Sequence, residues 1–152
     1  MNFSKNTNYR KNPEKYWEIE CQKTTYNELG VLRVEPYKRE ILPYWKFKTP
    51  EKAKESAEKI FEIYQKYKSK EDHVGMDMAR KYLQMGYTRS MRYYYHSDGK
   101  KYDKKGDIRA YQYDEEKKKS ANEFKKYFKK VIQDKDYKSM KEEKFQKYGK
   151  NE

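Results

Sequence analysis

The stretch TPEKAKESAEKIFEIYQKY, residues 49–67, sets much of the fold because it has a complete helix signal. Thr49 is a preferred N-cap residue, Pro50 suits the first helical position, and Glu51 places a negative charge at the positive end of the helix dipole. The apolar side chains recur at helical spacing: Ala53, Ala57, Ile60, Phe61, Tyr64 and Tyr67. The sequence therefore predicts a helix over residues 50–68, with this apolar stripe in the core. Its near-zero net charge is typical of a scaffold element.

Downstream of this helix, the pattern predicts four further helices. Residues 76–85 form the second helix, which Gly86 ends, and Thr88 caps the third. Asp114 then caps a fourth helix, which carries acidic residues in its first turn. Residues 137–148 suggest a fifth and weaker helix.

Upstream, short segments have the alternation or composition that is typical of strands. In residues 16–22 every second side chain is apolar, which predicts a half-buried strand. Residues 31–34 form a second strand, paired with the first as a hairpin, and residues 44–47 form a third. Because proline cannot lie in a central strand, Pro36 and Pro43 mark the stretch between them as an edge or an extended loop.

These elements together predict an α+β fold in which a short antiparallel N-terminal sheet packs against three to five helices. A chain of 152 residues fits a single domain. Residues 1–14 are expected to form a flexible N-terminal arm, residues 15–134 the domain, and residues 135–152 a C-terminal helix that can fray.

The composition limits the classes of function. Lys and Arg number 38 and Asp and Glu 25, so the formal net charge is +13. Only 34% of the residues are hydrophobic, so a folded core requires the 18 tyrosines to contribute to it. We expect neither a membrane-spanning nor a secreted protein, because no apolar run reaches transmembrane length and no signal peptide follows the first residue. The single Cys21 allows no internal disulfide and suits a reducing, cytoplasmic compartment, and we predict no cofactor and no metal.

The best candidate region for binding a polyanion is residues 73–113, which hold four of the seven arginines. Phosphate groups bind where donors cluster, and the arginine fork fits phosphate oxygens. Tyrosines between the arginines can stack on bases, and a lysine-rich loop over residues 97–109 can contact phosphates without reading sequence. The predicted nucleic-acid-binding residues are Arg80, Lys81, Arg89, Arg92, Tyr93, Tyr94, Lys100 and Lys101.

We therefore expect a nucleic-acid-binding accessory protein, with DNA or RNA as its partner, and two alternatives stay open. One is a small enzyme acting on a nucleotide or nucleic acid, with the same arginines and with Asp77 or His96 in proton transfer. The two histidines of the chain are a poor inventory for catalysis, and no catalytic residue can be assigned. The other alternative is a protein-interaction module whose lysines reflect the codon usage of an AT-rich genome.

A resemblance to a known family rests on two segments: EPYKREILPYWKFKTPE, residues 35–51, and GMDMARKYLQMGYTR, residues 75–89. These segments are similar to a family of small single-domain proteins of unknown function from bacteria, tailed phages and large DNA viruses. The likeness covers residues 15–105, the span of one small domain. It implies a compact intracellular protein, makes a viral origin one of the alternatives, and implies no substrate.

Overall fold

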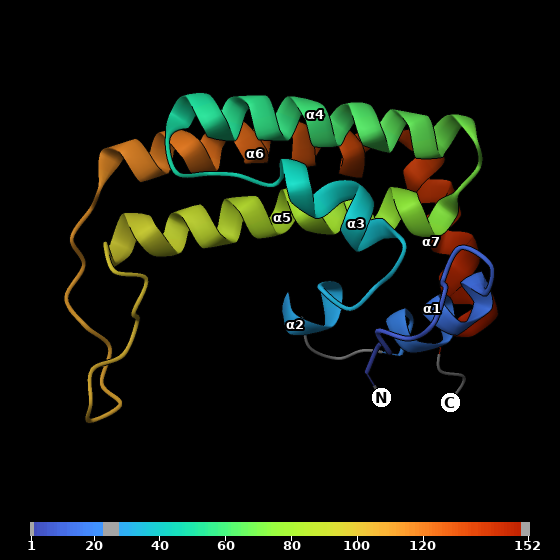
Figure 1. Ribbon diagram of the computed structural model, residues 1–152, viewed down its shortest axis with the longest axis horizontal. Coiled ribbons are helices and arrows are strands. Elements are labelled where there is room, and N and C mark those ends of the chain that lie inside the picture. The colour runs from blue at the N-terminus through green and yellow to red at the C-terminus, as the bar shows by residue number, and fades with distance from the viewer. Residues whose placement is uncertain (1, 23–27, 150–152) are drawn as a thin grey trace.

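The computed structural model describes residues 2–22 and 28–149, and over these residues the fold is helical (Figure 1). Its elements are α1 (Pro13–Glu20), α2 (Glu28–Val31), α3 (Tyr37–Ile41), the 3₁₀ turn η1 (Leu42–Tyr44), α4 (Pro50–Ser69), α5 (His73–Tyr95), α6 (Glu115–Gln133) and α7 (Lys135–Tyr148). No strand occurs in the described part of the chain, where β-type pairing is limited to the isolated bridges Asn8–Glu35 and Tyr102–Ile108. The predicted α+β fold with an N-terminal sheet is therefore wrong.

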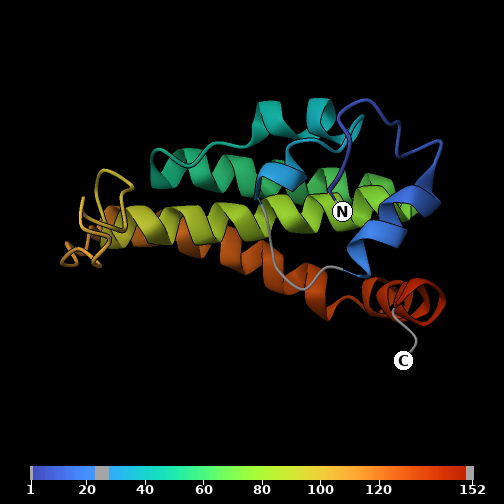
Figure 2. The same cartoon turned by 90° about the horizontal axis from the view of Figure 1, so that it is seen from below.

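Three long helices form the body of the molecule. Helix α5 runs antiparallel to α4 and to α6, and all three pack on one another (Figure 1). Helices α1 and α7 lie at the end where α4 turns into α5, whereas α3 lies beside α4 and α5 on the side away from α6 (Figure 2). The opposite end carries residues 96–114, which connect α5 to α6. We call this second end the basic end, defined by residues 45–52, 87–114 and 117.

Helix α4 confirms the helix predicted for residues 50–68. The Thr49 hydroxyl accepts a hydrogen bond from the Lys52 backbone nitrogen at 3.2 Å, as an N-cap does. Most of the predicted stripe is buried, with Ile60 fully enclosed, whereas Phe61 is only partly buried beside Tyr127. Helix α6 also begins where predicted, because Asp114 accepts a hydrogen bond from the Glu116 backbone nitrogen at 3.1 Å.

Helix α5 is one continuous element, and the predicted break at Gly86 and Thr88 is wrong. A Cβ atom at Gly86 would overlap the ring of Phe124 on α6. Glycine at this position therefore serves the close approach of two helices and not the end of one. The N-cap of the helix is Asp72, whose carboxylate accepts a hydrogen bond from the Gly75 backbone nitrogen at 3.0 Å.

The first predicted strand, residues 16–22, is the helix α1 and the turn that follows it. Pro13 lies in the first turn of this helix, where the missing N–H costs no hydrogen bond. Tyr16 and Trp17 are adjacent and both buried, which a half-buried strand cannot achieve because its neighbouring side chains point to opposite faces. The apolar spacing in so short a segment fits both periods, and burial on the bundle selects the helix.

The other strand predictions also fail. The second predicted strand begins with the last residue of α2, and residues 45–47 of the third are irregular. The connection of the predicted hairpin, residues 23–30, lies partly outside the described residues. Pro36 precedes α3 and Pro43 lies in the first turn of η1, so both prolines stand at helix starts.

Residues 2–12 contact the bundle through two buried rings. Phe3 and Tyr9 are each 1% exposed, and the Phe3 ring stacks on that of Tyr16 with centroids 5.2 Å apart. At the other end of the chain, α7 starts at the N-cap Asp134 and buries Tyr137.

Tyrosines supply much of the core, as the composition requires. Tyr16, Tyr37, Tyr64 and Tyr82 are among the largest fully buried side chains. Their rings pack in the interior, and several of their hydroxyls reach carboxylates. For example, the Tyr64 hydroxyl donates to Asp134 Oδ2 at 2.7 Å. The interior is therefore aromatic with polar tips, which allows a chain so poor in aliphatic residues to fold.

Candidate functional site

A buried ion cluster surrounds Asp77, in the N-terminal half of α5. This carboxylate is inaccessible to solvent and accepts hydrogen bonds from the hydroxyls of Tyr16 on α1 and Tyr137 on α7. Arg80 Nη2 donates to the same carboxylate at 2.7 Å, and Lys141 Nζ lies 3.3 Å from it. The cluster ties α1 and α7 to α5. Burial alone would raise the pKa of Asp77, but the nearby cations outweigh burial and hold the pKa well below its usual value.

Arg80 and Lys81, both predicted to bind phosphates, belong to this cluster. Arg80 Nε donates to the Tyr137 hydroxyl at 2.9 Å, and its Nη1 donates to Gln84 Oε1 at 2.7 Å. Lys81 donates to Glu20, and burial lowers the pKa of this lysine to about 8. Both side chains are therefore engaged inside the protein and unavailable to a polyanion. The sequence placed both residues on one predicted helix but carried no information on their burial.

The remaining predicted residues lie around the C-terminal end of α5. Arg92, Lys100 and Lys101 are exposed, Arg89 and Tyr93 are half-buried, and Tyr94 is 8% exposed. Tyr94 packs against other tyrosine rings and has little free surface for stacking on a base. The structure thus keeps four exposed or lining candidates together at the basic end: Arg92, Tyr93, Lys100 and Lys101.

One hollow of about 400 Å³ lies beside α5 at this end. Arg92 and Lys101 contribute its cationic side chains, and His96 is also in its lining. Its other lining residues are Tyr87, Thr88, Met91, Tyr95 and Tyr111. It has aromatic rings and cations but no carboxylate.

A second hollow, of about 450 Å³, was not predicted as a site. Trp45, Phe47 and Tyr93 give it aromatic walls, and its other lining residues are Lys46, Lys48, Lys52 and Lys117. Again no carboxylate lines it. The sequence signal for this hollow is the alternation of aromatic and basic residues in WKFK, residues 45–48, which overlaps the third predicted strand.

The connection between α5 and α6 adds exposed aromatic rings to this end. Tyr102, Tyr111 and Tyr113 are 55%, 49% and 54% exposed. Three acidic residues of the connection have partners within or beside it, and one of them, Asp98, forms an ion pair with Arg109 at 2.7 Å. Asp103 accepts hydrogen bonds from the backbone nitrogens of Lys105 and Asp107, and Asp114 caps α6.

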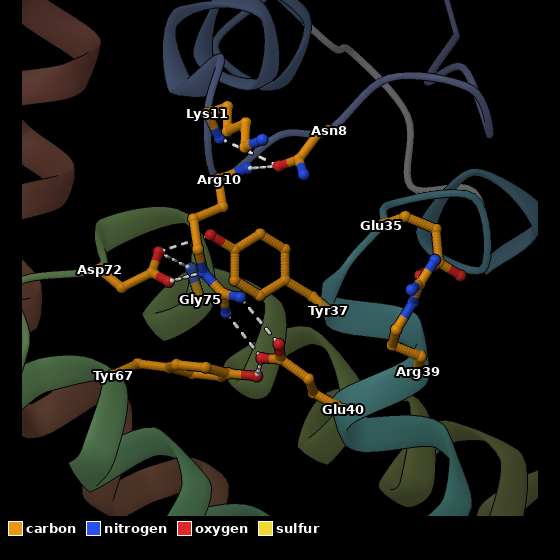
Figure 3. Close-up of polar contacts among 10 residues, drawn as sticks. All are labelled: Asn8, Arg10, Lys11, Glu35, Tyr37, Arg39, Glu40, Tyr67, Asp72 and Gly75. Carbon is orange, nitrogen blue, oxygen red and sulfur yellow. Dashed lines mark hydrogen bonds and ion pairs between the residues drawn. The ribbon is translucent and has the colours of Figure 1, made fainter.

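The opposite end of the bundle contains a network around Arg10 (Figure 3). Its Nη1 and Nη2 donate to Glu40 at 2.8 and 2.6 Å, and its Nε donates to Asp72 at 3.0 Å. Tyr37 donates to the second Asp72 oxygen at 2.6 Å, and Tyr67 donates to Glu40 at 2.8 Å. Hydrogen bonds from Arg10, together with that from Tyr67, lower the pKa of Glu40 in spite of its partial burial. The network was not predicted because its members lie far apart in the sequence.

A hollow of about 860 Å³ lies beside this network and has mixed charge. Its cationic lining residues are Arg10, Arg39, Lys59, Lys66, Lys70 and Lys144, and its acidic ones are Glu40, Glu71 and Asp72. Two of these carboxylates are already bound by Arg10. The absence of carboxylates therefore distinguishes the two hollows of the basic end from this one.

Within the described residues, no three His, Cys, Asp or Glu side chains gather closely enough to hold a metal ion. None of the described helices is both long and apolar enough to span a bilayer.

The fold and its surfaces define a small basic helical-bundle protein with a tyrosine-rich core. The chain belongs to the family described as "Domain of unknown function (DUF4385)", which it matches over residues 2–147. The match confirms the resemblance at the level of a family without an assigned function. Neither a curated protein nor a solved structure matches the chain.

Proposed function

We propose that this protein is a nucleic-acid-binding accessory protein whose basic end contacts phosphates. The observation that carries the proposal is the composition of the two hollows at that end. Each combines aromatic rings with Lys or Arg, and neither has a carboxylate in its lining. Nucleic acid offers the matching pair of groups, since its bases have flat apolar faces and its backbone is anionic.

The accessible cations favour contacts with the backbone over base reading. Arg92 and Lys101 are exposed beside one hollow, whereas Lys46 and Lys48 are exposed beside the other. A lysine neutralises a phosphate but provides no planar fork for a base edge. We therefore infer binding with little sequence preference. Arg80 and Lys81 take no part in this proposal, because their donors are bound in the Asp77 cluster.

The proposal leaves no catalytic role for the residues considered for one. Asp77 is enclosed by cations and tyrosines, and His96 is 3% exposed with its ring against that of Tyr111. We further infer a cytoplasmic location, which suits the free Cys21, and a phage or viral source remains part of the proposal through the family resemblance.

The test is the salt dependence of binding to a fluorescently labelled oligonucleotide. About four to six phosphate contacts predict a slope of about −3 to −5 when the logarithm of affinity is plotted against that of salt. Replacing Arg92 and Lys101 by Ala together is expected to reduce the magnitude of this slope by about one to two.

The matched control replaces Lys5 and Lys11 by Ala. Both are exposed near the N-terminus, and their replacement removes the same charge as that of Arg92 and Lys101. If replacing Lys5 and Lys11 weakens binding as much as replacing Arg92 and Lys101, the basic residues act only through overall charge. Codon usage then explains the high lysine content of the chain. If the wild-type protein binds no oligonucleotide at low salt, the proposed function is wrong.

A further inference from the structure

The hollow between Trp45, Phe47 and Tyr93 has walls that are fixed by the core. The rings of Trp45 and Phe47 meet edge to face, with centroids 4.9 Å apart, and Phe47 lies 6.3 Å from Tyr93. Trp45 also contacts the buried ring of Tyr82, and Phe47 contacts that of Phe124. These contacts hold the aromatic walls in place before any ligand arrives, so little ordering cost remains for binding.

The rim of the same hollow is held by contacts between separate segments. Lys117, at the start of α6, donates to the Lys48 carbonyl at 2.7 Å and lies 5.9 Å from the centroid of the Tyr93 ring. Gly99, in the connection between α5 and α6, lies beside Tyr93. A Cβ atom added at Gly99 would come within 3.0 Å of the Tyr93 ring. Aromatic walls and cationic rim are thus brought together from α5, α6 and the segment before α4.

We infer that this hollow takes one unpaired nucleobase, so that the nucleic acid bound at the basic end is single-stranded. The inference rests on the proposed function and names its substrate class. A volume of about 450 Å³ lies within the range of small-ligand sites, about 300–1,000 Å³. An occupant must be apolar and flat at its centre and anionic around it, and a nucleotide within a strand has this combination.

Whether the base is already unpaired decides whether the hollow accepts a single strand or a duplex more readily. In a duplex the base faces are covered by their neighbours, and a base can enter a hollow only after it has been unpaired and unstacked. In a single strand the base is already free, and stacking on aromatic side chains tolerates any sequence. The exposed Tyr102, Tyr111 and Tyr113 offer further stacking surfaces on the same end. The hollow therefore favours the single strand.

The experiment compares labelled single-stranded DNA and RNA of about 15 nucleotides with a duplex of the same length, at equal salt. Single strands are expected to bind at least tenfold more tightly than the duplex. They are also expected to quench the fluorescence of Trp45, whereas Trp17, only 1% exposed, would not report the ligand. In Trp45→Phe the quenching would be lost.

Phe47→Leu and Tyr93→Leu are each expected to weaken single-strand binding about five- to a hundredfold, with the salt slope unchanged, because they remove stacking and no charge. Tyr44→Leu is the control: this ring is 45% exposed, lies under Lys59, and lines the hollow at the other end. Circular dichroism and the unfolding midpoint identify a variant that fails to fold, while the quenching experiment uses the wild-type protein.

Two results would overturn the inference while leaving the proposed function in place. In one, duplex and single strand bind equally well. In the other, single strands bind without quenching Trp45. Replacing Arg92 and Lys101 then weakens binding, whereas Phe47→Leu and Tyr93→Leu leave it unchanged. If no nucleic acid binds and an acidic, tyrosine-containing peptide quenches Trp45 instead, both the inference and the proposed function are wrong.

Discussion

Gly86 of α5 lies directly against the ring of Phe124 of α6, with no space for a Cβ atom between them. Phe124 is fully buried and also contacts Phe47, a wall of the proposed base-binding hollow. The contact fixes the distance between two helices and thereby the position of the basic end.

Gly86→Ala is expected to destabilise the protein. Alanine gains about 1 kcal/mol over glycine inside an exposed helix, but here its methyl group would overlap an enclosed ring. Overpacking of this kind costs about 1–3 kcal/mol and is expected to exceed the gain. Urea unfolding measures the difference. Asn122→Ala, at an exposed position of α6, is the control and is expected to change stability by less than about 0.5 kcal/mol. A more stable Gly86→Ala variant would show that the two helices do not pack in this way.

Asp77→Asn is expected to cost about 3–5 kcal/mol near neutral pH, because it leaves buried cations without their partner. The folded pKa of Asp77 lies below its unfolded value, so its stabilisation is present above about pH 4 and is lost as the pH falls through the folded pKa. The deficit of the variant is therefore expected to shrink in acid. Free energies of unfolding at neutral and acidic pH test this.

Asp136 provides the comparison for that experiment, since its pair with Lys68 is 3.3 Å long and its side chain is 71% exposed. Asp136→Asn is expected to cost no more than about 1 kcal/mol. Equal losses in the two variants would mean that the Asp77 cluster is solvated.

Arg10→Ala is expected to release the N-terminal arm from the bundle. Arg10 holds both Glu40 and Asp72, yet it is partly exposed, so we expect a loss of about 1–2 kcal/mol after allowance for solvent screening. Trypsin is expected to cleave the variant faster after Lys5 and Lys11. Arg39→Ala is the control, because Arg39 pairs with Glu35, four residues before it, and is 74% exposed. Unchanged proteolysis in Arg10→Ala would contradict the role of the network.

Cys21 is expected to react slowly with a thiol reagent in the folded protein and quickly in denaturant. It is 7% exposed, and burial raises the pKa of its thiol, so little thiolate is present near neutral pH. The rate of labelling measures this. Similar rates in the two states would place Cys21 at the surface.

The sequence predicts α4 and the start of α6 well and the N-terminal segments poorly, for a physical reason. Residues 50–68 offer several turns of consistent pattern with a cap at the start, and Asp114 marks the start of α6 equally clearly. Residues 16–22 are too short to separate a period of two from one of 3.6. Burial of the adjacent Tyr16 and Trp17 on the bundle decides that case, and burial is a property of the whole fold.

The candidate site shows the same division between local and distant information. The helix predicted for residues 76–85 holds both Asp77 and Arg80, but the partners that bury them, Tyr16 and Tyr137, come from α1 and α7. The predicted Arg92 and Lys101 do share a hollow. The full lining of the second hollow does not follow from the WKFK segment alone, because Tyr93 and Lys117 reach it from elements that are remote in sequence.

The tyrosine-rich interior limits the stability of the folded protein at alkaline pH. Burial, together with hydrogen bonds to carboxylates, raises the pKa of Tyr16, Tyr64 and Tyr67 above that of a free phenol. Their contribution to stability is fully present below about pH 10, and it is lost progressively at higher pH, because only the unfolded chain then releases these protons. In a titration followed by phenolate absorbance, these rings would ionise together as the helices melt, and the protein would lose its structure in alkali as a single event.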